Sequence, residues 1–145
     1  ETGAELDSLS TREVVALDFA ETLRDSRQLR RSYLAFEWVA DGRTVSSGTV
    51  LFVKPKHFDF LDPDIRVDAV EEDDRFVVTA TSRAFARFVL LELAGADAEW
   101  SDNVFDLSAD RPHVVTVRKD GLSEPLDLKS FRERLKATSL FDTFE

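Results

Sequence analysis

The sequence predicts an all-β protein built from antiparallel β-sandwich units. Three observations lead to this prediction. Apolar and polar residues alternate along most segments, as in strands that bury one face. Turn signals recur roughly every 8 to 12 residues, the spacing of short strands in sandwiches. Little of the chain shows the apolar spacing of an amphipathic helix. Short strands in packed sheets are therefore expected throughout.

Size and charge limit the functional classes. The chain has 145 residues and a formal net charge of -10, so it can form one domain or two small ones with a real core. An acidic surface opposes binding to nucleic acid and to anionic membranes. The absence of cysteine excludes disulfides, thiolate metal sites and thiol nucleophiles. No apolar run is long enough to span a membrane, so we expect a soluble protein, either cytoplasmic or secreted.

The first segments favour strands. Residues 12–19 (REVVALDF) alternate with period two and predict a strand. In residues 32–53, two strand-like runs flank Asp41 and Gly42, a pair that favours a tight hairpin because its glycine tolerates positive φ. Trp38 lies on the apolar face of the first run and is expected in a core.

The prolines of residues 54–64 indicate a connector and a domain boundary near residue 55. Residues 1–54 then hold only about three strands, fewer than a free-standing sandwich usually has. We therefore expect an incomplete front domain whose first strands lie before residue 1, and which could form a homodimer through its incomplete sheet. Residues 55–122 form the second sandwich, and residues 123–145 form a tail that docks on the body.

The second sandwich is predicted from four segments, at residues 65–72, 75–82, 84–95 and 113–119. The third segment contains helix-forming residues, but we interpret it as a strand because its neighbours are strands and its apolar residues fit one face. Those residues are Phe85, Val89, Leu91 and Leu93.

The tail is expected to include one short helix capped by Asp127, since its apolar residues have helical spacing. They are Leu128, Phe131 and Leu135. The apolar residues nearest the end, Leu140, Phe141 and Phe144, are expected to dock on the body.

Motifs for catalysis or cofactor binding are absent from the sequence. The acidic runs contain no calcium-loop pattern, and His57 and His113 lack the spacing of metal ligands. There is no G-x-S-x-G nucleophile turn and no glycine-rich phosphate loop. We expect no cofactor, no metal and no catalytic residue in this chain.

Residues 99–110 (EWSDNVFDLSAD) allow two interpretations. As a plug, Trp100 and Phe105 would close one end of the sandwich, while Asp102 and Asn103 bond the turn's own backbone. As a substrate-binding site, Trp100 would stack on a sugar ring, and Asp102 and Asn103 would bond its hydroxyl groups. The plug is the favoured interpretation, and the sugar site stays open.

Several segments resemble a known family. They are TVLFVKPKHFDF, DPDIRV, RFVVTATSRAFARFVLLEL, WSDNVFDL, VVTVR and the closing SLFDTF. Together they resemble the C-terminal region of glycoside hydrolase family 2 β-mannosidases, in which Ig-like and carbohydrate-module-like β-sandwich domains follow a catalytic barrel. The resemblance implies that residues 4–54 are the last strands of one sandwich, and that residues 56–120 form the final Ig-like domain.

The resemblance also implies a function for the parent enzyme. Such an enzyme removes terminal β-linked mannose from the non-reducing end with retention, using two carboxylates about 5–5.5 Å apart and no metal. In the family both are barrel glutamates, one just after an asparagine, and no NE pair or βα repeat occurs here.

We therefore expect a non-catalytic accessory segment. Its partners would be the catalytic barrel and the N-terminal domains of the parent enzyme, with mannosides as candidate ligands. The alternatives are an independent carbohydrate-binding module and an Ig-like protein-interaction domain.

Overall fold

The computed structural model describes residues 3, 5, 7–109 and 111–143. In this part of the chain most of the regular structure is strand in antiparallel sheets, and the two α-helices are short, which confirms the all-β prediction. The chain divides into two compact units, Glu1–Tyr33 with Leu51–Phe58 and Leu34–Val50 with Asp59–Glu145. No helix among the described residues is long and apolar enough to cross a membrane.

The first unit contains helix α1 (Ser26–Arg31) and the 3-10 turn η1 (Pro55–His57). A capping box starts α1. The Asp25 carboxylate accepts from the Gln28 backbone N–H at 2.8 Å, and the Gln28 side chain accepts from the Asp25 backbone N–H at 3.3 Å. This cap explains how a helix forms in a segment with few apolar positions.

The strand predicted at residues 12–19 is wrong. The segment has no regular structure, and Val15 and Leu17 are 52% and 58% exposed. Alternation shows that a segment could bury one face, but a strand also needs a neighbour that pairs with its backbone N–H and C=O groups. Within the described ranges, residues 12–19 have no such neighbour.

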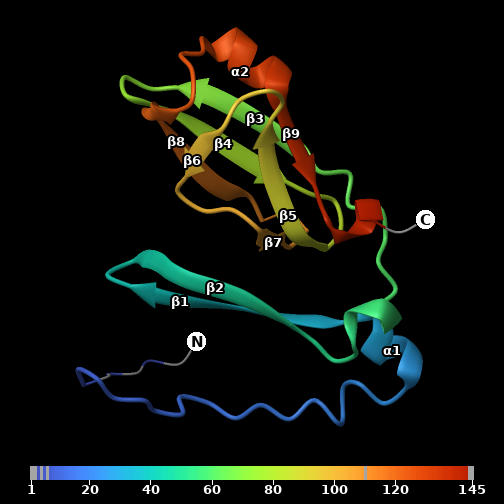
Figure 1. The fold of residues 1–145 in the computed structure, drawn as a ribbon. Helices are drawn as coiled ribbons and strands as arrows, with labels where there is room; N and C mark the ends of the chain where they lie inside the picture. Colours follow the sequence, from blue (N-terminus) through green and yellow to red (C-terminus); the bar gives the residue numbers. More distant parts are fainter. Residues whose placement is uncertain (1–2, 4, 6, 110, 144–145) are drawn as a thin grey trace. The chain divides into compact units, whose positions relative to one another are not determined.

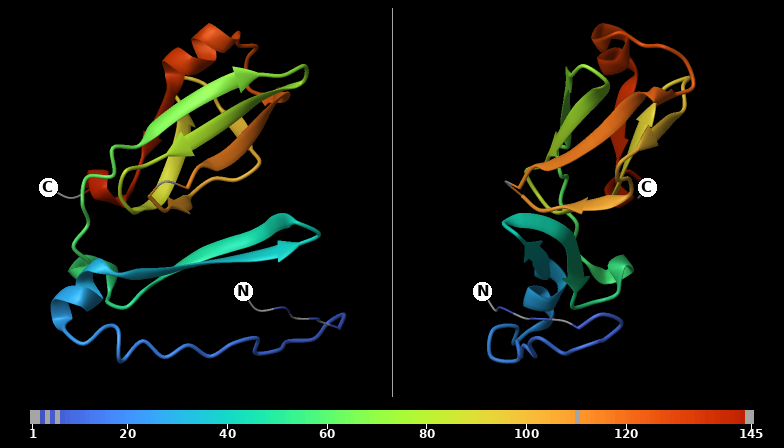
Figure 2. Two further views of the ribbon diagram at one scale, coloured as in Figure 1. Left: turned by 180° about the vertical axis from the view of Figure 1, so that it is seen from behind. Right: turned by 90° about the vertical axis from the view of Figure 1, so that its left-hand side faces the viewer.

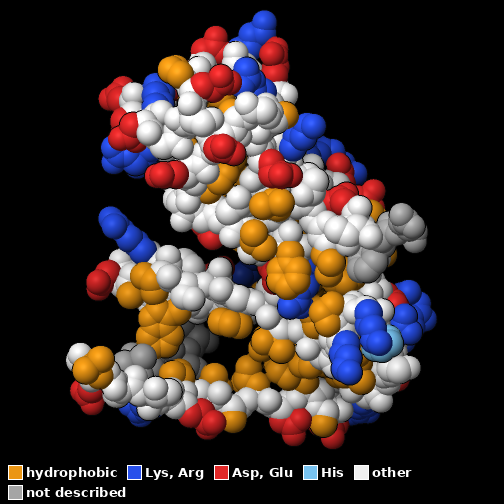
Figure 3. Space-filling model, viewed as in Figure 1, with side chains coloured by type: hydrophobic (Ala, Val, Ile, Leu, Met, Phe, Trp, Pro, Cys, Tyr) orange, Lys and Arg blue, Asp and Glu red, His pale blue; other side chains and the backbone are white. Residues whose placement is uncertain are grey.

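The predicted hairpin is confirmed. Strands β1 (Tyr33–Ala40) and β2 (Arg43–Leu51) form a two-stranded sheet, and Asp41 and Gly42 between them both have positive φ, 51° and 73°. The expectation that Trp38 is a core residue is wrong, because its relative exposure is 36%. Hydrophobic side chains are visible over this hairpin in Figure 3. A two-stranded sheet alone cannot bury its apolar face.

The sandwich body consists of two antiparallel sheets (Figures 1 and 2). One has the order β3-β4-β8-β6, with β3 at Arg66–Glu71, β4 at Arg75–Thr81, β8 at His113–Leu122 and β6 at Ala98–Trp100. The other has the order β7-β5-β9, with β7 at Phe105–Leu107, β5 at Ala86–Leu93 and β9 at Leu135–Thr138. The segment 84–95 is therefore a strand, as predicted.

The core lies between these sheets. Alternate residues of β4 and β8 are fully buried, as their period-two pattern predicts. They are Phe76, Val78, Ala80, Val115 and Val117. Helix α2 (Leu128–Arg134) adds Phe131, whose buried ring stacks on Phe76 with centroids 4.2 Å apart. Asp127 caps α2 as predicted, accepting from the Ser130 backbone N–H at 2.7 Å.

The tail contributes a strand in addition to the predicted helix. Strand β9 pairs with β5 from Leu93↔Leu135 to Leu90↔Thr138, so the end of the chain supplies a strand of the second sheet. Leu140 and Phe141 follow in the 3-10 turn η2 (Leu140–Thr143) and are half-buried. Phe144 lies outside the described residues.

Candidate functional site: a pocket beside the β5–β7 pair

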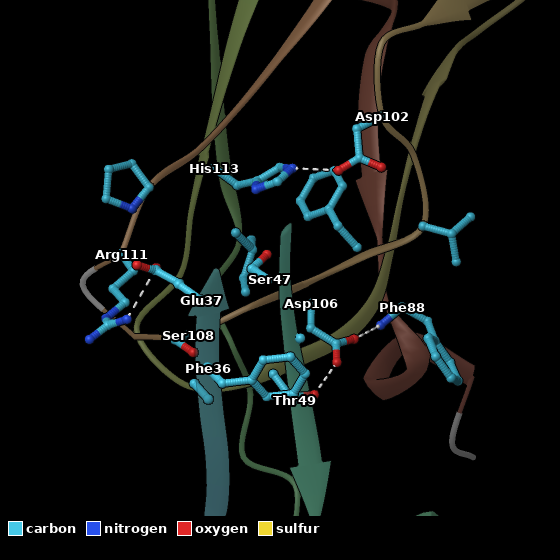
Figure 4. Close-up of a pocket in the computed structure, with 16 residues that line it drawn as sticks. Phe36, Glu37, Ser47, Thr49, Phe88, Asp102, Asp106, Ser108, Arg111 and His113 are labelled. Atoms are coloured by element: carbon cyan, nitrogen blue, oxygen red, sulfur yellow. Dashed lines mark hydrogen bonds and ion pairs between the residues drawn. The ribbon is translucent and has the colours of Figure 1, made fainter. Parts of the chain in front are cut away.

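A pocket of about 320 Å³ lies beside the β5–β7 pair (Figure 4). Its lining comes from β1 and β2, from Phe88 on β5, from residues 102–108 apart from Asn103, and from residues 111–113. All these residues belong to the second compact unit. The pocket combines aromatic rings with several charged side chains, which makes it the candidate site.

A histidine and a carboxylate meet at one side of the pocket. Asp102 Oδ2 lies 2.9 Å from His113 Nε2. The His113 ring stacks on Phe105, which is buried, with centroids 4.1 Å apart. The stacked ring and the hydrogen bond together hold both polar side chains in fixed positions. His113 was isolated in the sequence, and the fold brings it to Asp102.

Asp106 holds a second part of the pocket wall. Its Oδ1 accepts from the Phe88 backbone N–H at 2.9 Å, and its Oδ2 accepts from the Thr49 hydroxyl. Phe88 has a φ of +54°, and the β5–β7 register shifts between Ala86 and Val89. Asp106 thus secures a β-bulge, a feature that often redirects a side chain beside a binding site.

Phe36 supplies an aromatic wall. A Cβ atom on Gly48 would lie 2.6 Å from Phe36 Cζ, so the ring rests directly against this glycine. Phe36 is 50% exposed and lines the pocket. Because any larger residue at position 48 would displace the ring, glycine fixes where the aromatic surface lies.

Charges around the pocket are mainly acidic. Glu37, Asp102 and Asp106 line it, and Arg111 pairs with Glu37 at 3.3 Å. Among the described residues, no group of three or more His, Cys, Asp or Glu side chains is arranged to hold a metal ion. This lining suits a neutral ligand with hydroxyl groups, since carboxylates accept hydrogen bonds and repel anions.

Two protein-family models match this chain. A model described as a Mannosidase Ig/CBM-like domain matches residues 1–57, and the Ig_mannosidase model, described as an Ig-fold domain, matches residues 60–143. The chain belongs to the mannosidase Ig-fold family.

The fold of this mannosidase Ig-fold chain is similar to that of a solved structure. It is the crystal structure of a β-D-mannosidase from Dictyoglomus thermophilum, with a TM-score of 0.63 and 17% identity. The match covers 74% of the present chain and 13% of that chain. Among the curated proteins, none matches the sequence.

Of the three sugar-binding residues predicted from the sequence, only Asp102 lines the pocket of this mannosidase Ig-fold chain. The half-buried Trp100 packs on the core, with its ring 6.4 Å from that of Phe131. The Asn103 side chain accepts from the Leu91 backbone N–H at 2.9 Å and donates to the Leu91 carbonyl at 3.0 Å. Trp100 and Asn103 thus contact the sandwich itself, and sugar binding by the three residues stays a prediction.

Sequence reasoning missed most of the pocket. Asp106 lies in the acidic loop that was singled out, but its partners Thr49 and Phe88 come from other strands. Phe36 lies two residues before Trp38 and so on the same strand face, and nothing local indicates that its ring rests on Gly48. Such a pocket depends on which strands become neighbours, and the local pattern does not report that.

Proposed function

We propose that this chain is the non-catalytic, C-terminal accessory segment of a retaining β-mannosidase of glycoside hydrolase family 2. The observation that carries the proposal is the pair of mannosidase domain models that match it in tandem, at residues 1–57 and 60–143. The shared fold with a β-D-mannosidase supports it, and the chain spans about an eighth of the length of that protein, 13%.

The carboxylates of the pocket support a non-catalytic role. Retaining hydrolysis needs one carboxylate as a nucleophile and another as an acid and base, about 5–5.5 Å apart. Asp106 instead accepts hydrogen bonds at both oxygens, from Phe88 and Thr49, and serves the bulge. Asp102 pairs with His113. Both carboxylates are therefore engaged by neighbouring groups of the pocket wall.

The role that fits such a segment is packing. In the proposed enzyme the sandwich covers a flank of the catalytic barrel, and the barrel carries the two catalytic glutamates. The coding sequence upstream of Glu1 tests this directly. We expect it to encode a βα-repeat barrel with an Asn-Glu pair at a strand end. An upstream region without a barrel would overturn the proposal.

A further inference from the structure

We propose that the pocket beside β5 and β7 binds one neutral pyranose ring of a mannoside, with Phe36 as the stacking surface. The choice of mannose rests on the proposed function above, whereas the preference for a neutral sugar follows from the pocket itself. The site differs from the one that the sequence predicted, because Trp100 and Asn103 lie outside it.

Phe36 gives the pocket an aromatic surface. A sugar ring presents a face of C–H groups, which packs on an aromatic ring and releases water from both surfaces. Phe36 is half-exposed, lines the pocket and rests against Gly48. A ring that is already positioned loses little side-chain freedom when a ligand stacks on it.

Polar groups also line the pocket wall. Sugar sites fix orientation with a few convergent polar groups in a mainly apolar surface. Here Asp102 is held by His113, and Asp106 is held by the Phe88 backbone N–H. Each carboxylate oxygen has two lone pairs, so a bonded carboxylate can still accept from a ligand hydroxyl. Ser108 also lines the pocket and adds a hydroxyl group.

Charge and size narrow the ligand class. The acidic residues Glu37, Asp102 and Asp106 line the pocket with a single arginine, Arg111, so a phosphorylated or carboxylated sugar would meet repulsion. A volume of about 320 Å³ lies at the small end of the range for ligand pockets, which suits one ring better than a long chain.

The test is a titration of the 145-residue chain followed by amide chemical shifts in two-dimensional NMR spectra. The probes are methyl β-D-mannopyranoside and β-1,4-mannobiose. We expect saturable shifts centred on Gly48 and Ser108, and weaker binding of mannose 6-phosphate. The proposal is overturned if neither probe gives saturable shifts, if the shifts are centred elsewhere, or if mannose 6-phosphate binds as tightly as the neutral probes.

Matched variants assign the binding to the ring. Phe36→Ala should weaken binding about tenfold, the size of an aromatic stacking contribution. Phe36→Trp should retain it, and Gly48→Ala should weaken it by displacing the ring. Val45→Ala is the control, because Val45 is 59% exposed on the same hairpin and does not line the pocket. An equal loss in Val45→Ala would overturn the proposal.

The thermal unfolding profile of each variant shows that it is folded before it is titrated. If the titration fails, the proposed accessory role still stands, and the segment is then a spacer without a sugar site. An upstream region without a barrel removes that role, and the titration then reports on the pocket alone.

Discussion

At the residue scale, Asn103 shows how one side chain can replace a strand. Its amide bonds both backbone groups of Leu91, at 2.9 and 3.0 Å, and so continues the pairing of β5 beyond β7. The sequence indicated that this asparagine bonds backbone groups. It could not name Leu91, which lies 12 residues away, because that pairing exists only once the sheet has formed.

Replacing this side chain should destabilise the chain measurably. In Asn103→Ala the Leu91 N–H and C=O lose their partners in a half-buried place, which costs about 1–3 kcal/mol in the free energy of unfolding. Urea denaturation followed by tryptophan fluorescence measures the change. Glu92→Gln, at an exposed position of β5, is the control and should leave stability nearly unchanged. A stability loss no larger in Asn103→Ala than in the control would contradict this account of the loop.

At the element scale, local patterns succeed where an element has its packing partner in the chain. Alternation predicted β4, β5 and β8 because each buries one face against the opposite sheet. The same pattern failed at residues 12–19, where no pairing strand lies in the described part of the chain. It could not predict β9 either, because only the pairing with β5 holds that short segment extended.

Helix α2 belongs to the core through one ring. Phe131 is fully buried and stacks on Phe76. Phe131→Ala should lower the free energy of unfolding by about 3–5 kcal/mol, because it leaves a cavity between the helix and the first sheet. Phe131→Leu keeps most of the volume and should cost clearly less. Chemical denaturation of both variants measures the difference, and equal costs would show that volume is not what Phe131 contributes.

Because the carboxyl group of Asp127 caps α2, part of the free energy of unfolding depends on pH. The Ser130 backbone N–H, which donates to Asp127, lowers the pKa of that carboxyl below its ordinary value of 3.8. A lowered pKa stabilises the fold at every pH above the ordinary value, and this contribution is lost as the pH falls through the folded-state pKa.

Asp127→Asn isolates that contribution, because asparagine still caps the helix but does not titrate. Urea midpoints measured at about pH 5 and about pH 2 should fall less for the variant than for the wild type. If both proteins lose stability equally between these conditions, the Asp127 carboxylate is not the source of the effect.

At the scale of the whole molecule, the last strand of the chain completes the second sandwich. Its second sheet has the order β7-β5-β9, so it is complete only when the last strand pairs with β5. Arg132 adds an anchor, donating from Nε to the Ala69 carbonyl at 2.8 Å. The tail is therefore part of the fold, and the sequence predicted its docking and its helix but not its strand.

Ending the chain after Arg134 removes β9 and η2 and exposes the edge of β5. An unpaired edge strand with an apolar face tends to pair with other molecules, so the shortened protein should lose its cooperative unfolding transition and associate. Light scattering and thermal denaturation measure both effects. The substitution Lys136→Gln at an exposed site on β9 is the control, and it should leave a cooperative monomer. A truncated chain that unfolds as cooperatively as the full one would contradict this role of the tail.

The central proposal is that this chain is an accessory segment of a mannosidase and does not perform the hydrolysis itself. Turnover of 4-nitrophenyl β-D-mannopyranoside by the purified chain tests it most directly, measured beside a double variant, Asp102→Asn with Asp106→Asn. We predict that neither protein releases nitrophenol above the buffer rate. Turnover by the wild type that the double variant lacks would place catalysis in this pocket and contradict the claim.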